Sequence, residues 1–304
     1  MEGVVVHAEK DLISRIDEFV QKRSRMTFRG NRRPLLARRV TERVGKLGLL
    51  DAAEYLEFLQ RNQQEEELFF DLLTTNETYF FRIREQFSCL ADEVLPAFQE
   101  QRNREVVRSW GERESGRTSD IMKLRVLCAG CSTGEEPYSV AMTLNETLRF
   151  PRAWDIRILA GDLSATCLEY ASRGVYTEDR MKGIPPEYVA RYFHQSPEGY
   201  QVGEELRRMV RFHRLNLAGI IDGEDFPGVE TPFAGFDLIF CRNVMIYFSP
   251  SAQQDLIDTL YRSLVPGGWL FTGDGEPLHL FRHEFSSPAP DAPFVYRKGG
   301  CHAG

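Results

Sequence analysis

The sequence predicts an α/β protein in which an open, mostly parallel sheet follows an all-helical N-terminal region. From residue 123 onward, short apolar segments alternate with helical ones, the pattern of parallel strands that are joined by helices. Over residues 1–100, apolar side chains instead recur three or four positions apart, as they do on one face of a helix. The change of period indicates two domains.

Helical spacing divides the predicted N-terminal domain, residues 1–100, into several helices. Leu36, Val40 and Leu47 give one helix an apolar stripe, and Asp51 is placed to cap the next helix. Because these stripes cover only one face of each helix, we expect the helices to pack around a shared core. Further helices are expected over residues 65–73 and 87–101.

The region from Lys22 to Arg43 has an unusual charge. It contains nine basic residues and one acidic residue, Glu42, although the whole chain has a formal net charge of -7. A positive patch on a negative protein indicates a docking surface for an acidic partner, and the negative total argues against nucleic acid as the main partner. Nucleic acid binding by this patch and a helix that is merely solvated are the alternatives. The predicted docking residues are Arg32, Arg39, Arg43 and Lys46.

The composition and the spacing of particular residues indicate the cellular location, the redox state of the cysteines and whether a metal is bound. The N-terminus lacks a signal-peptide pattern and no apolar run is long enough to span a bilayer, so we expect a cytoplasmic protein without membrane insertion. Six scattered cysteines indicate reduced thiols. No metal site is expected, because neither the Cys128 and Cys131 pair nor the His279 and His283 pair has further ligands at suitable spacing.

The predicted second domain, residues 123–304, follows a polar linker over residues 101–122. Its strands are expected at residues 124–129, 156–163, 236–241, 269–272 and 294–296. Aromatic and β-branched residues, among them Val210 and Phe212, interrupt this alternation on either side of a Pro and Gly turn. They predict a small antiparallel β-subdomain inserted at about residues 175–215.

A glycine turn follows the first strand and opens a helix with two carboxylates, in the order A-G-C-S-T-G-E-E over residues 129–136. A helix N-terminus attracts phosphate groups, but Glu135 and Glu136 would repel a diphosphate. They suit a ligand that has ribose hydroxyls or positive charge, and S-adenosylmethionine has both. We expect Gly130 and Glu135 to contact that cofactor and Glu136 to serve the helix start. An ordinary strand-to-helix turn is the alternative.

Polar residues follow three other strands of the predicted sheet. Asp162 ends the second strand, Asn216 follows the strand after the insertion, and Arg242 and Asn243 come directly after Cys241. Ligands of open parallel sheets bind beyond the carboxyl ends of the strands, so these side chains are candidates for one site. Alternatively, Asp162 and Asn216 cap helices and Arg242 pairs with a surface carboxylate.

Four motifs together resemble the CheR-type chemotaxis receptor methyltransferases over most of the chain. They are T-T-N-E-T-Y-F-F-R, A-G-C-S-T-G-E-E-P-Y-S, F-D-L-I-F-C-R-N-V-M-I-Y-F and L-V-P-G-G-W-L, which begin at Thr74, Ala129, Phe236 and Leu264. The resemblance implies a Rossmann-like class I methyltransferase sheet with helices on both faces. It also implies S-adenosyl-L-methionine as methyl donor, S-adenosyl-L-homocysteine as product, and protein-glutamate O-methyltransferase activity in chemotaxis.

The resemblance also implies roles for particular residues. The substrate would be glutamates in the acidic, helical methylation region of methyl-accepting chemotaxis receptors, acted on by a monomeric enzyme. Such a glutamate is already ionised near neutral pH, so no general base is needed. We expect Tyr247, with Arg82 or Arg242, to orient its carboxylate. The cofactor residues implied are Asn76, Thr78, Arg82, Glu135, Asp162, Asn216, Leu217, Arg242 and Asn243, beside Gly130.

Two departures from the family pattern bear on the substrate. The family often has G-H-S-E after the Gly-Gly strand, whereas this chain has G-D-G-E-P-L from Gly273 to Leu278. The loop from His194 to Gly199 is short, so we expect binding that does not depend on a receptor's C-terminal pentapeptide. A catalytically idle cofactor-binding signalling module, and a methyltransferase for another carboxylate or for nucleic acid, are the competing functions.

Overall fold

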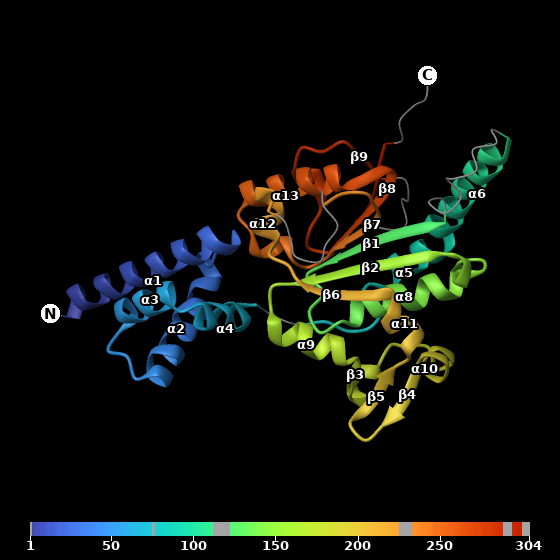
Figure 1. Ribbon diagram of the computed structural model, residues 1–304. Coiled ribbons are helices and arrows are strands. Elements are labelled where there is room, and N and C mark those ends of the chain that lie inside the picture. Colours follow the sequence, from blue (N-terminus) through green and yellow to red (C-terminus); the bar gives the residue numbers. More distant parts are fainter. Residues whose placement is uncertain (1, 75–76, 112–121, 225–232, 288–293, 300–304) are drawn as a thin grey trace.

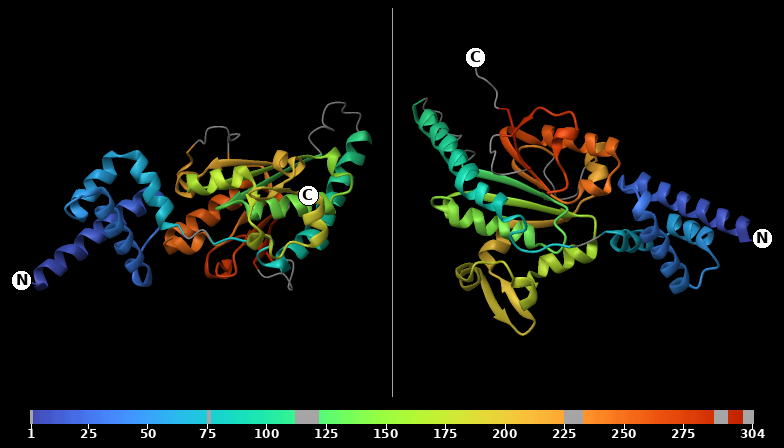
Figure 2. Two further views of the ribbon diagram at one scale, coloured as in Figure 1. Left: turned by 90° about the horizontal axis from the view of Figure 1, so that it is seen from below. Right: turned by 180° about the vertical axis from the view of Figure 1, so that it is seen from behind.

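The computed structural model describes residues 2–74, 77–111, 122–224, 233–287 and 294–299 (Figure 1). A helical N-terminal domain lies at one end of an α/β domain, and a small β-subdomain projects from the side of that α/β domain. The views from below and from behind agree on this arrangement (Figure 2). Within the described residues, no helix combines the length and the apolar character needed to cross a bilayer.

The N-terminal domain consists of α1 (Glu2–Ser24), α2 (Arg33–Leu47), α3 (Ala52–Arg61) and α4 (Gln63–Leu73) in the described residues, with a 3-10 turn, Gly30–Arg32, before α2. The predicted cap is confirmed, because the Asp51 carboxylate accepts hydrogen bonds from the amides of Ala53 and Glu54 at 2.8 and 3.0 Å. These amides begin α3 and would otherwise lack partners. Ile16, Leu36 and Phe69 are fully buried between the helices.

The helical domain ends near Leu73 in the structure and not at residue 100. The next helices, α5 (Arg84–Cys89), a π-helical turn (Leu90–Val94) and α6 (Leu95–Gly111), pack on the sheet. Phe87 and Leu90 belong to the same apolar core as Val126 and Phe240 of the strands. The predicted linker, residues 101–122, therefore begins inside α6, and residues 112–121 lie outside the described residues.

The main sheet confirms the predicted class. In the described residues it has seven strands in the order β6-β2-β1-β7-β8-β10-β9. The strands from β6 to β8 run parallel, while β10 is antiparallel to both β8 and β9. Their bounds are β1 Lys123–Ala129, β2 Asp155–Asp162, β6 Val210–Arg214, β7 Phe236–Cys241, β8 Leu264–Thr272, β9 Phe285–Ser286 and β10 Val295–Lys298.

Alternating side chains of the strands enter two apolar cores, one on each face of the sheet. Val126 packs with α8 (Glu135–Thr147), whereas the next residue, Leu127, belongs to the core of α12 (Leu217–Asp222) and α13 (Pro250–Ser263). Burial on both faces explains why each central strand is a continuous apolar run. Helix α9 (Ala165–Arg173) follows β2 and contacts both β2 and α4 of the N-terminal domain.

The inserted β-subdomain is a three-stranded antiparallel sheet in the described residues, with the order β3-β5-β4. It contains β3 (Val175–Tyr176), β4 (Phe193–Ser196) and β5 (Gly199–Val202), and the short helices α10 (Pro186–Tyr192) and α11 (Glu204–Met209) flank it. The predicted insertion extended too far. The strand with Val210 and Phe212, β6, pairs in parallel with β2 in the main sheet.

One predicted docking residue, Arg43, is instead part of the core of the N-terminal domain. Its guanidinium makes two hydrogen bonds to the Glu65 carboxylate, at 2.8 and 2.7 Å, and the Tyr55 hydroxyl donates to the same carboxylate at 2.9 Å. The side chains of Arg43 and Glu65 are only 7% and 6% exposed. Arg43 follows Leu36 and Val40 by seven and three residues, so it shares their buried face of α2.

We predict that Arg43→Met lowers the free energy of unfolding by about 3–5 kcal/mol, because it leaves the Glu65 carboxylate buried without its cation. The double variant Arg43→Met/Glu65→Leu should recover most of this loss. Arg38→Met is the matched control, since Arg38 is exposed and its pair with Glu42 is screened by water. Urea denaturation measures all three, and an equal loss in Arg38→Met and Arg43→Met would contradict the assignment.

Candidate cofactor-binding site

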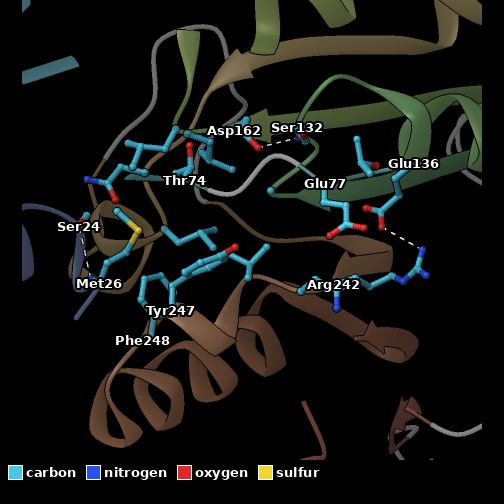
Figure 3. Close-up of a pocket in the computed structure, with 18 of the residues that line it drawn as sticks. Ser24, Met26, Thr74, Glu77, Ser132, Glu136, Asp162, Arg242, Tyr247 and Phe248 are labelled. Carbon is cyan, nitrogen blue, oxygen red and sulfur yellow. Dashed lines mark hydrogen bonds and ion pairs between the residues drawn. The ribbon is translucent and has the colours of Figure 1, made fainter. Parts of the chain in front are cut away.

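A cavity lies where the carboxyl ends of β1, β2, β6 and β7 meet the N-terminal domain (Figure 3). Most predicted site residues line it, although they come from five separate segments of the chain. Asn76 is the exception that cannot be placed, because it lies outside the described residues. The lining residues are Ser24, Met26, Thr74, Glu77, Thr78, Arg82, Gly130, Ser132, Glu136, Asp162, Leu163, Leu215, Asn216, Leu217, Arg242, Asn243, Val244, Tyr247 and Phe248.

The glycine turn brings the ends of three strands together. Gly130 has a φ of 79°, and a Cβ atom at this position would collide with the side chain of Val244, which follows β7. The amides of Gly130 and Cys131 donate to the carbonyl oxygen of Gly161 in β2, at 2.7 and 2.9 Å. Gly130 therefore contributes a close approach of backbone segments that no other residue type permits.

Of the two carboxylates of the turn, Glu136 lines the cavity and Glu135 is buried beside it. Glu135 is fully buried, accepts a hydrogen bond from the Thr133 hydroxyl at 2.7 Å and pairs with Arg180. It does not line the cavity, whereas Glu136 does. Consecutive residues of a helix point about 100° apart, so only one carboxylate of this first turn can face the cavity. Burial raises the pKa of both carboxyl groups.

One oxygen of the Glu136 carboxylate has no hydrogen-bond partner among the described residues. Its Oε2 lies 3.1 Å from Nη1 of Arg242, while its Oε1 is buried and has no hydrogen-bond partner within the described ranges. An unsatisfied buried carboxylate oxygen is costly, so it marks a position where a bound donor is favourable. Glu136, rather than Glu135, therefore has the position for a contact with a ligand.

Positive and negative groups are gathered at one end of the cavity, where Figure 3 shows Glu77, Glu136 and Arg242 close together. Arg242 is buried, donates to the carbonyl oxygen of Arg82 and lies over the ring of Phe87 at 5.6 Å. Arg82 donates to the carbonyl oxygen of Glu77 at 2.8 Å. This end can therefore bind a zwitterionic group, with carboxylates for its cation and guanidiniums for its anion.

Asp162 and Asn216 both line the cavity, and of the two only Asn216 caps a helix, since Ser164 caps α9. The Asp162 carboxylate accepts from the amides of Ser132 and Ser164 at 2.7 and 2.9 Å and also lines the cavity. Burial raises the pKa of this carboxyl group. Asn216 caps α12 through the Ala218 amide, at 3.0 Å, and its Nδ2 donates to the carbonyl oxygen of Arg23 at 2.7 Å. Each residue thus makes hydrogen bonds that stabilise the fold and also forms part of the cavity wall.

Tyr247 lies in the cavity wall at the junction of the two domains. Its carbonyl oxygen accepts from the amide of Thr27 at 2.9 Å, and the guanidinium of Arg32 lies 4.7 Å from the centre of its ring. Arg32 is the member of the predicted docking set that reaches the cavity wall. Of the others, Arg39 donates to Glu42 and to the carbonyl oxygen of Leu72, and Lys46 is exposed.

Sequence reasoning missed the contribution of the segment after α1. Ser24 and Met26 line the cavity, and Met26 forms an isolated antiparallel bridge with Phe248. Neither residue type carries a sequence signal for a ligand site, and their place depends on how the domains pack. They lie opposite the charged end of the cavity, near Thr74 (Figure 3). This less polar end fits an adenosyl group, and the charged end fits the amino and carboxylate groups of a methionine.

We predict that Gly130→Ala lowers the affinity for S-adenosylhomocysteine about tenfold or more, because left-handed backbone costs alanine about 1–2 kcal/mol and the new methyl displaces Val244. Gly48→Ala is the control, since Gly48 has a similar φ of 67° with nothing within 4 Å of the added carbon. Isothermal titration calorimetry measures both. Unchanged binding by Gly130→Ala would show that the close approach is dispensable.

Two family models together match most of the chain. The model of the CheR methyltransferase SAM-binding domain matches residues 76–290, and the model of the CheR methyltransferase all-alpha domain matches residues 11–74. The two matches meet close to the domain boundary that the structure places after Leu73.

Three relatives illustrate the similarity. A chemotaxis protein methyltransferase of Borreliella burgdorferi is 32% identical over 289 residues, covering 93% of this chain and 94% of that protein. That of Escherichia coli is 34% identical over 279 residues, covering 90% and 86%. The probable biofilm formation methyltransferase WspC of Pseudomonas aeruginosa is 33% identical over 267 residues, covering 87% of this chain and 56% of that protein. The chain thus belongs to the CheR methyltransferase family.

Proposed function

We propose that this S-adenosylmethionine-dependent methyltransferase methylates glutamate side chains of methyl-accepting chemotaxis receptors. The observation that carries the proposal is the cavity at the carboxyl edge of the sheet, with a zwitterion-binding end and Tyr247 in its wall. The names of the relatives support methylation in chemotaxis. We place the enzyme in the cytoplasm and expect it to act as a monomer.

The cavity offers a partner for each part of the cofactor. We assign the amino group of its methionine to the unsatisfied Oε1 of Glu136, with Glu77 nearby, and the carboxylate to Arg82. The ribose hydroxyls are assigned to Asp162, because a short carboxylate held by two amides is rigid. The remaining contacts are assigned to Asn76, Thr78, Asn216, Leu217, Arg242 and Asn243.

Catalysis then depends on position rather than on acid or base chemistry. Bound S-adenosylmethionine supplies a methyl group, which one oxygen of the ionised glutamate takes up as an ester while the sulfonium becomes a neutral thioether. Tyr247 and Arg82 orient the incoming carboxylate, since both line the cavity and Arg82 is only partly buried. Arg242 is already bound to Glu136 and to the Arg82 backbone, so it holds these groups in place. Such orientation can remove roughly 7–11 kcal/mol of a barrier.

The acidic methylation helix of a receptor is the partner that the charge of α2 favours. Arg32 lies over Tyr247, and the exposed side chains of Arg38 and Lys46 follow on the same helix. Arg43 is removed from this surface, because it is buried with Glu65. In the β-subdomain, the turn between β4 and β5 contains only Pro197 and Glu198, so we propose that no receptor pentapeptide binds there.

The decisive experiment supplies the purified protein with radiolabelled S-adenosylmethionine and membranes that contain the receptors of its own organism. Label in the receptor band that is released by mild base indicates a methyl ester on glutamate. Tight cofactor binding without transfer would instead identify an idle signalling module, and base-stable label would exclude a carboxylate substrate.

We predict that Tyr247→Phe lowers kcat for receptor methylation by about 10- to 100-fold, the effect of losing one hydrogen bond to a charged group. The affinity for S-adenosylhomocysteine should change little, because the ring beneath Arg32 remains. Tyr261→Phe is the control, since Tyr261 lies at the end of α13 and does not line the cavity. Unchanged turnover in Tyr247→Phe would remove Tyr247 from the catalytic set.

Reversing the exposed charges of α2 tests the docking surface. In the variant Arg38→Glu/Lys46→Glu we expect KM for the receptor to rise about 3- to 10-fold at low salt, with kcat unchanged and a weaker dependence on salt. Arg149→Glu/Arg152→Glu reverses the same number of exposed charges before β2, at the opposite edge of the sheet. An equal effect of the two variants would mean that only the net charge matters.

A further inference from the structure

Glu276 is a buried carboxylate at the end of β8 that sequence reasoning assigned to no function. It is 5% exposed. Its Oε2 accepts hydrogen bonds from the amides of Gly273 and Asn243, both at 2.7 Å, and its Oε1 accepts from the amide of Ile246 at 3.2 Å. Burial raises the pKa of this carboxyl group, and the amides oppose that shift. A carboxylate in this position joins two separate loops.

The amides that it binds determine the path of the loop after β7. Asn243 has a φ of 58°, in the left-handed region that asparagine tolerates better than most other residues with a side chain. Arg242, Asn243 and Tyr247 are all carried by this loop and all line the cavity. The hydrogen bonds of Glu276 therefore act on the backbone directly beneath the proposed cofactor and substrate contacts.

The end of β8 is shaped to admit this carboxylate. A Cβ atom at Gly273 would lie 2.6 Å from the Glu276 Oε2 and 2.7 Å from the amide nitrogen of Asn243. Glycine is thus needed for the two loops to approach. Beside it, the Asp274 carboxylate accepts from Nδ2 of Asn243 at 3.2 Å, which fixes the orientation of that amide.

We propose that Glu276 is a positioning residue for methyl transfer. Its carboxylate holds residues 243–246 against the end of β8 and so sets where Asn243 and Tyr247 stand in the cavity wall. This role rests on the proposed function, because it concerns the same cavity. The turn Gly273–Glu276 would then align the residues of the cavity wall as well as stabilise the fold.

Asp237 offers a matched control at the other end of β7. It is also a buried carboxylate, 4% exposed, which accepts from the amide of Arg125 at 2.8 Å and pairs with Arg102 at 2.8 Å. It lies at the edge of the sheet opposite the cavity and lines no part of it. A merely structural carboxylate should therefore behave like Asp237.

The experiment compares the isosteric variants Glu276→Gln and Asp237→Asn. An amide has one acceptor oxygen, so Glu276→Gln cannot accept from all three amides, and its NH2 group would face one of these N–H donors. We expect both variants to unfold at a lower urea concentration. Only Glu276→Gln should weaken S-adenosylhomocysteine binding and lower kcat for receptor methylation, each by about 10- to 100-fold, when measured well below either transition. Glu276→Asp keeps the charge but shortens the reach, and should show the same pattern if the glutamine variant does not fold.

The proposal is overturned if Glu276→Gln binds and turns over within about twofold of the unaltered protein, or if Asp237→Asn loses binding and turnover equally. The cofactor titration separates this outcome from failure of the proposed function. If the unaltered protein binds S-adenosylhomocysteine but methylates no receptor, the proposed substrate is wrong, while a selective loss of binding in Glu276→Gln still supports the positioning role.

Discussion

The site depends on the close approach of Gly130 to Val244, which brings the loop after β1 against the loop after β7. The same turn is bound to β2 through Gly161. A parallel sheet alone would leave these loops side by side without a fixed relation, since connections vary more than the strands that they join. Here the absence of a side chain at Gly130 lets Val244 pack directly against the turn, and the polar residues that follow these strands then face one volume.

Around this contact, the charged residues are held chiefly by backbone groups. Asp162 accepts from two amides, Glu276 accepts from amides of two loops, and Arg242 donates to the carbonyl oxygen of Arg82. Hydrogen bonds to backbone fix a side chain to the fold itself and not to another mobile side chain. The side chains of the cavity wall are therefore held in position before any ligand binds. Catalysis by orientation requires such preorganisation.

The sequence predicted the class of the sheet, the cap at Asp51 and about half of the residues that line the cavity, because these follow from local period, cap chemistry and strand ends. Residues whose roles depend on distant packing were misplaced. Arg43 looked like an exposed cation, and only the Glu65 carboxylate 22 residues later makes it a core residue. Local pattern also did not separate Glu135, which is buried and pairs with Arg180, from Glu136, which lines the cavity. No local pattern could assign Met26 to a cavity formed with Phe248.

The part played by Ser24 and Met26 in the cavity wall has a thermodynamic consequence. Because both domains contribute to one binding surface, a ligand that fills it favours the docked arrangement over any separated one. By mass action, a ligand present at a hundredfold excess over its Kd adds about 2.7 kcal/mol to that preference. Occupancy of the cavity is thus linked to the orientation of α2 relative to the sheet.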